Sequence, residues 1–189
     1  NRALVPVLRE IGHCLSALGR DDDALGEYRR AVERTAAESG ERRDLYERMA
    51  EIHRRRGDLR AFVESIERRP GGGRVRTELL ARLYDELADT DRALAAYRRA
   101  LAQSPRSVDL RMRMIQLLQR SGRLGEATAE YERLVARAPT ETRWVVELAD
   151  LYLRAGDRAR ALRLLDQASA RAGDDAALHQ SLAELFARW

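Results

Sequence analysis

The chain has 189 residues, of which 44% are hydrophobic and 5% aromatic, with only four prolines. This composition favours a folded domain or repeat array over disorder, and the abundance of Ala, Leu, Arg and Glu predicts an all-α fold. No run of about 18 apolar residues is present, so we expect no membrane-spanning helix.

Net charge and cysteine content exclude few classes of function. Every one of the 35 basic residues is arginine, and the net charge is +4. The absence of lysine is more typical of codon bias in a GC-rich genome than of selection for an anion. The single cysteine, Cys14, permits no internal disulfide and no metal cluster, which favours the cytoplasm without excluding other compartments. Because the sequence starts at Asn1, we expect a processed form or one domain of a larger protein.

Apolar spacing and turn residues predict eleven helices. In chain order they lie near residues 3–18, 21–37, 42–56, 59–69, 75–87, 90–103, 107–121, 124–137, 141–155, 158–172 and 175–188.

Several of these helices repeat with a fixed period. Ala93, Ala127 and Ala161 lie 34 residues apart, and each is followed four residues later by Tyr or Leu on the same helix face. Gly122 falls between the two helices of its unit, where a short turn needs backbone freedom, and Pro139 ends that unit. Each unit is therefore predicted to be a helical hairpin.

The same frame extends in both directions, with Gly12, Ala24 and Tyr28 in a first unit and Leu182 and Phe186 in a sixth. This pattern resembles the tetratricopeptide repeat family over nearly the whole chain. The resemblance implies an α-solenoid, wound as a right-handed superhelix, of five such hairpins plus a C-terminal single helix in one domain, 1–189. The expected units are 5–38, 43–73, 74–107, 108–141 and 142–175, with a terminal helix at 176–189.

The second unit departs from the pattern. Phe62 stands where the other units have alanine, and the run from Pro70 to Gly73 is expected to end the helix early. This departure is interpreted either as a tolerated degenerate repeat or as a hinge with altered curvature.

By resemblance, the first helix of each hairpin lines a concave groove that binds a peptide or partner protein. The residues expected to face it are Arg9, His13, Glu47, Glu51, Glu78, Arg82, Met112, Gln116, Gln119, Val146, Asp150 and Arg154. Met112 and Val146 are exposed aliphatic side chains in this prediction, and such side chains suit a protein contact better than a solvated face.

An arginine-rich segment offers an alternative site for an anion or nucleic acid. Residues 54–76 contain eight arginines against three acidic residues, a local excess of five positive charges. The candidate anion patch consists of Arg54, Arg55, Arg56, Arg69, Arg74 and Arg76. Only one aromatic residue, Phe62, lies in the segment, so nucleic-acid binding is disfavoured.

No catalytic constellation is recognisable. His13, His53 and His179 are spread over three repeats, and the adjacent His13 and Cys14 point about 100° apart on a helix. We therefore expect a non-catalytic protein-binding scaffold, with no cofactor and no metal.

Overall fold

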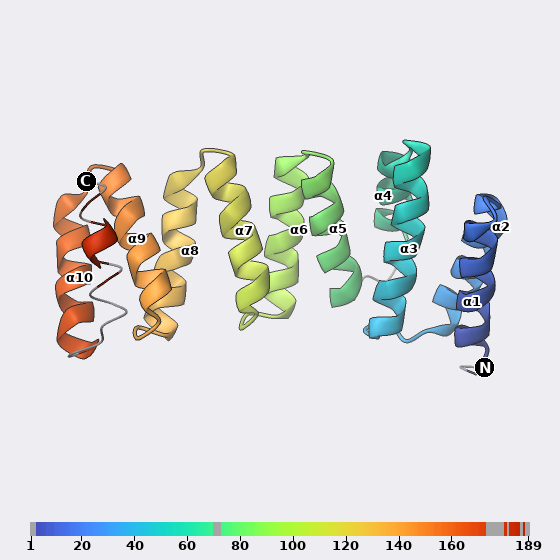
Figure 1. Ribbon diagram of the computed structural model, residues 1–189, viewed down its shortest axis with the longest axis horizontal. Helices are drawn as coiled ribbons and strands as arrows, with labels where there is room; N and C mark the ends of the chain where they lie inside the picture. The colour runs from blue at the N-terminus through green and yellow to red at the C-terminus, as the bar shows by residue number, and fades with distance from the viewer. Residues whose placement is uncertain (1–2, 70–72, 173–179, 181, 186, 188–189) are drawn as a thin grey trace. The chain divides into compact units, whose positions relative to one another are not determined.

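The computed structural model describes residues 3–69, 73–172, 180, 182–185 and 187 (Figure 1). Regular structure in these residues is entirely α-helical, which confirms the all-α class. The helices with defined bounds are α1 (Leu4–Ala17), α2 (Asp21–Arg34), α3 (Gly40–Arg56), α4 (Leu59–Glu67), α5 (Arg74–Glu86), α6 (Thr90–Gln103), α7 (Val108–Arg120), α8 (Leu124–Arg137), α9 (Thr142–Arg154) and α10 (Arg158–Ala172).

The chain divides into two compact units, Asn1–Ser107 and Val108–Trp189. This division falls on one of the predicted repeat boundaries. The first unit holds α1 to α6, and the second holds α7 to α10 together with the described residues that follow. The assignment of the whole chain to one domain, its five repeat bounds and the handedness of the superhelix stay predictions.

A left-handed residue closes the turn inside each hairpin. Gly19, Gly57, Gly122 and Gly156 have φ between 73° and 78°, which glycine adopts without strain. In every hairpin the next amide donates to the carbonyl five residues earlier, at 2.8 to 3.1 Å, as in a Schellman cap. The third hairpin places Ala88 at this position, with φ 56°, and it is the one non-glycine residue with positive φ in the described chain.

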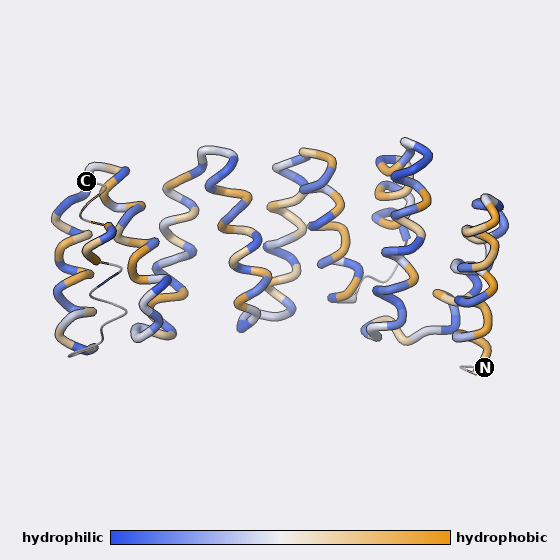
Figure 2. The backbone as a smooth tube through the Cα atoms, in the orientation of Figure 1, coloured by the Kyte–Doolittle hydropathy of each residue, from blue (hydrophilic) through white to orange (hydrophobic). Residues whose placement is uncertain are grey.

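Small residues and tyrosines fill the contact between the two helices of a hairpin. The repeat alanines Ala93, Ala127 and Ala161 are completely buried, as the 34-residue pattern predicts. In the first hairpin Gly12 faces the buried ring of Tyr28 so closely that a Cβ atom would lie 2.6 Å from the ring carbon Cε1. Hydrophobic residues accordingly recur among hydrophilic ones along each helix (Figure 2).

The second hairpin accommodates its larger residue by stacking. The Phe62 ring lies parallel to the His53 ring, with the centroids 4.5 Å apart, and both side chains are buried. His53 Nδ1 is held 2.8 Å from Asp58 Oδ1 at the turn. The helix ends early, at Glu67, as expected. These contacts favour the degenerate-repeat interpretation, while the hinge stays a prediction.

The predicted helix at 175–188 lies largely outside the described residues, and so does Phe186, one of the two residues that extend the repeat frame into a sixth unit. Residues 180, 182–185 and 187 are helical, in agreement with the prediction. Leu182 and Leu185 are buried.

Candidate functional site

In the first unit, a hollow of about 240 Å³ lies between α1 and α3 and is named the α1–α3 hollow. It is lined by His13, Ser16, Ala17, Tyr28, Arg48, Glu51, Ile52 and Arg55. Two of the predicted partner-binding residues, His13 and Glu51, meet there from different helices, and both are exposed. The structure therefore brings together one pair of side chains that the sequence placed 38 positions apart.

The hollow has an aromatic wall and a fixed polar rim. Tyr28 is buried, and burial raises the pKa of its hydroxyl, so the phenol is neutral at physiological pH. Arg55 donates to Ser16 Oγ at 2.9 Å and to Asp21 Oδ1 at 2.8 Å, which ties α3 to both helices of the first hairpin. Glu51 accepts from Arg54 at 2.6 Å. His13, by contrast, has no partner among the described residues.

A ladder of ion pairs joins the first helices α3 and α5. Its three rungs are Arg43–Glu78 at 2.7 Å, Glu47–Arg82 at 2.7 Å and Arg54–Glu86 at 2.5 Å. Arg82, a predicted partner-binding residue, is therefore already engaged with Glu47. These half-exposed pairs are each worth at most about 1 kcal/mol, but they neutralise this stretch of the surface.

The predicted residues of the second unit differ in accessibility. Gln116 and Arg154 are exposed, and Met112, Gln119 and Val146 are half-buried. Asp150 is only 7% exposed and pairs with Arg154 at 2.7 Å, so it does not lie on an open face, and its contact with a partner stays a prediction. The helix period placed it outside the packing frame, but neighbouring side chains cover it. In the first unit, Arg9 is half-buried and pairs with Glu10 at 3.2 Å.

The structure weakens the anion-patch hypothesis. Arg54 pairs with Glu51 and Glu86, Arg55 with Asp21, Arg56 with Asp22, and Arg74 with Glu38 and Glu78. Most of these acids lie more than 30 positions away in sequence, so a local charge count omits them. The excess of five positive charges along the segment is consequently cancelled in space.

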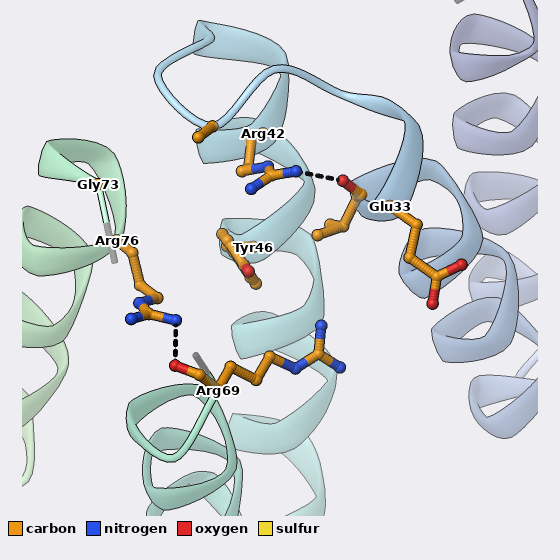
Figure 3. A pocket seen from close by; sticks show the side chains of 8 residues that line it. Glu33, Arg42, Tyr46, Arg69, Gly73 and Arg76 are labelled. Carbon is orange, nitrogen blue, oxygen red and sulfur yellow. Dashed lines mark hydrogen bonds between the residues drawn. The ribbon is translucent and has the colours of Figure 1, made fainter. Parts of the chain in front are cut away.

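A second cavity, of about 160 Å³, lies next to this segment and was not foreseen from sequence (Figure 3). Its lining includes Arg42, Tyr46, Arg69 and Arg76. Arg42 donates to the carbonyls of Val32 and Thr35, at 2.7 and 2.6 Å, and so caps the C-terminal end of α2. Arg76 donates to the carbonyl of Arg69 at 2.7 Å after α4. Both guanidinium groups thus serve the fold.

The described residues contain no group of three or more His, Cys, Asp or Glu side chains that could hold a metal ion. In the same part of the chain, no helix combines the length and hydrophobicity needed to cross a membrane.

Comparison with known proteins identifies the family. The family model of the tetratricopeptide repeat matches residues 86–145 and 120–185, which together cover more than half of the chain. No curated protein sequence matches this chain. Among similar solved structures, MamA has 16% identity and a TM-score of 0.57, with 91% of this chain and 93% of that chain covered.

YrrB, described as a TPR protein with an unusual peptide-binding site, has 18% identity and a TM-score of 0.56, covering 94% and 89% of the two chains. A Podosopora anserina putative kinesin light chain with nearly identical TPR-like repeats has 18% identity and a TM-score of 0.52, covering 93% and 99%. These likenesses show the same fold. Together with the family match and the repeated hairpins, they lead to one conclusion: this chain belongs to the tetratricopeptide repeat family.

Proposed function

We propose that the chain is a non-catalytic scaffold that binds a peptide or a partner protein through its first helices, with the α1–α3 hollow as one contact point. Proteins of this family generally mediate protein–protein interactions. The observation that carries the proposal is the accessible hollow itself, into which His13 and Glu51 project beside the apolar Ala17 and Ile52. Such a mixture of apolar wall and polar rim is typical of peptide-binding surfaces.

A peptide is favoured over a nucleic acid because of charge. The arginines nearest the hollow, Arg48 and Arg55, are each held by an aspartate, Asp44 and Asp21. A phosphate backbone would have to displace these ion pairs. A peptide can instead contact the exposed side chains of His13 and Glu51. The peptide-binding site described for YrrB supports the same class of ligand. In the second unit, the half-buried Met112 and Val146 are proposed as further contacts.

The proposal is tested by selecting peptides from a random display library on the chain and measuring their affinity by calorimetry. Ala17→Trp should fill the hollow and weaken a selected peptide at least about tenfold, since hot spots cluster in such pockets. Ala61→Trp is the matched control, because Ala61 is also exposed on a helix but lines neither the α1–α3 hollow nor the second cavity. Met112→Glu with Val146→Glu tests the second unit in the same way.

The outcome that contradicts the proposal is equally specific. Peptides that bind both tryptophan variants and the Met112/Val146 variant as tightly as the unaltered chain would place the site elsewhere. The anion alternative is tested with Arg69→Glu, since the Arg69 side chain has no ion-pair partner among the described residues. Loss of salt-sensitive oligonucleotide binding in that variant would favour the alternative.

A further inference from the structure

Three arginine side chains line the second cavity without a carboxylate partner. Arg42, Arg69 and Arg76 form no ion pair with any described residue, and Glu33, the acidic residue of the lining, is exposed and pairs with none of them. Other arginines of the first unit, such as Arg54, are paired with carboxylates. The side chains that line the cavity therefore carry three positive charges against one negative charge.

The fold orients two of these guanidinium groups through neutral acceptors. Arg42 donates through Nε to the Thr35 hydroxyl at 3.2 Å, and through Nη2 to the carbonyls of Val32 and Thr35. Its Nη1 has no acceptor among the described residues. Arg76 uses only Nη1, which donates to the carbonyl of Arg69 at 2.7 Å. Carbonyls and hydroxyls fix a guanidinium group without cancelling its charge, so the remaining donors are pre-organised for an anion.

Arg69 supplies a guanidinium group that the described fold does not use. Its side chain makes no hydrogen bond and no ion pair with another described residue. In Figure 3, the guanidinium groups of Arg42, Arg69 and Arg76 lie on different sides of Tyr46, whose buried ring lines the same cavity. The three arginines come from α3, from the end of α4 and from α5, so separate elements bring their donors to one small space.

The charge and size of the second cavity suit a phosphoryl group. The planar guanidinium fork of arginine matches the geometry of phosphate oxygens, to which it can donate two parallel hydrogen bonds. The cavity of about 160 Å³ has the room of about five water molecules, which is enough for the five heavy atoms of a phosphoryl group. A phosphate monoester carries nearly two negative charges at neutral pH, and the lining has an excess of two positive charges.

We infer that the second cavity is a binding site for a dianionic phosphoryl group, held by Arg42, Arg69 and Arg76. Free phosphate and a phosphorylated side chain of a partner protein present this same group. The cavity shares no lining residue with the α1–α3 hollow, so the phosphoryl site is separate from the proposed peptide contact.

Titration calorimetry of the full chain tests the inference with two probes, inorganic phosphate and a short uncharged peptide that carries one phosphoserine. Both probes should bind, and the tighter one identifies the source of the group. The unphosphorylated peptide and dimethyl phosphate, which carries a single charge, should bind at least about tenfold more weakly than the corresponding dianion. No binding of either phosphorylated probe would overturn the inference. An oligonucleotide that binds more tightly than both would do so too, because it would assign the cavity to nucleic acid.

Arg69→Gln tests the site itself, because it removes a guanidinium group that makes no described contact. It should weaken the binding of both phosphorylated probes at least about tenfold, with an unchanged circular dichroism spectrum, since charge-assisted hydrogen bonds are the strong ones. Arg68→Gln is the matched control, because the neighbouring Arg68 pairs with Glu64 and does not line the second cavity. Arg68→Gln, and Ala17→Trp in the α1–α3 hollow, should bind both probes like the unaltered chain. Unchanged affinity in Arg69→Gln, or an equal loss in Arg68→Gln, would overturn the inference.

Discussion

Gly12→Ala should destabilise the first hairpin, although the same change normally stabilises a helix. An alanine Cβ at this position would lie 2.6, 2.8 and 3.0 Å from Cε1, Cδ1 and Cζ of Tyr28. Carbon atoms pack best at about 3.5 to 4.0 Å, so the buried ring would have to move by close to 1 Å. Overpacking of this kind costs about 1 to 3 kcal/mol, and three simultaneous contacts place the cost near about 3 kcal/mol.

Helix propensity offsets part of that cost. Replacing glycine by alanine inside a helix gains about 1 kcal/mol, which leaves a net loss of about 2 kcal/mol for Gly12→Ala. Gly26 on α2 is the matched control, because a Cβ atom added there would meet nothing within 4 Å. Gly26→Ala should therefore stabilise the chain by about 0.5 to 1 kcal/mol.

Urea unfolding followed by far-UV circular dichroism measures both variants. The two midpoints should move in opposite directions from that of the unaltered chain. Combining Gly12→Ala with Tyr28→Leu should cost less than the sum of the single changes, since the ring carbons that clash are removed. If Gly12→Ala is as stable as Gly26→Ala, the close approach of the two helices does not limit the packing of this hairpin, and the reasoning fails.

Three further predictions concern stability. Ala88→Gly should raise the free energy of unfolding by about 1 kcal/mol in chemical denaturation, because Ala88 alone carries a side chain at a left-handed turn position of the described hairpins. An unchanged free energy of unfolding would show that the backbone at Ala88 is not strained. Glu130→Ala should cost about 1.5 to 3 kcal/mol in the same assay, because it removes the buried carboxylate that pairs with the buried Arg111 and with Arg133; a loss below about 1 kcal/mol would mean that water reaches the pair. Burial raises the pKa of Tyr84 and of Tyr131 to about 12, so the stability they contribute is complete below pH 10 and is lost as the pH rises towards 12. Phenolate absorbance should show these two tyrosines ionising near pH 12 in the folded chain, and ionisation near pH 10 would refute their burial.

The candidate site was predictable only in part. The helix period placed His13 and Glu51 on exposed faces of first helices, and both line the α1–α3 hollow. The same period placed Asp150 on an exposed face, where it is in fact buried. The hydrophobic period predicts which side of a helix a residue occupies, but the burial of its side chain depends on side chains from other helices.

The family, the helices and the hairpin turns could be predicted from the sequence, because they depend on local signals. A 34-residue period, apolar positions three and four apart, and a glycine such as Gly122 after the first helix act within one repeat. Which charged side chains and which apolar helix faces remain exposed became clear only from the packing of the helices. Arg55 meets Asp21 and Arg54 meets Glu86 across helices, and Ile11 is exposed while its repeat equivalent Met49 is buried. Such outcomes depend on which neighbour each face receives, and residues distant in the sequence supply that neighbour.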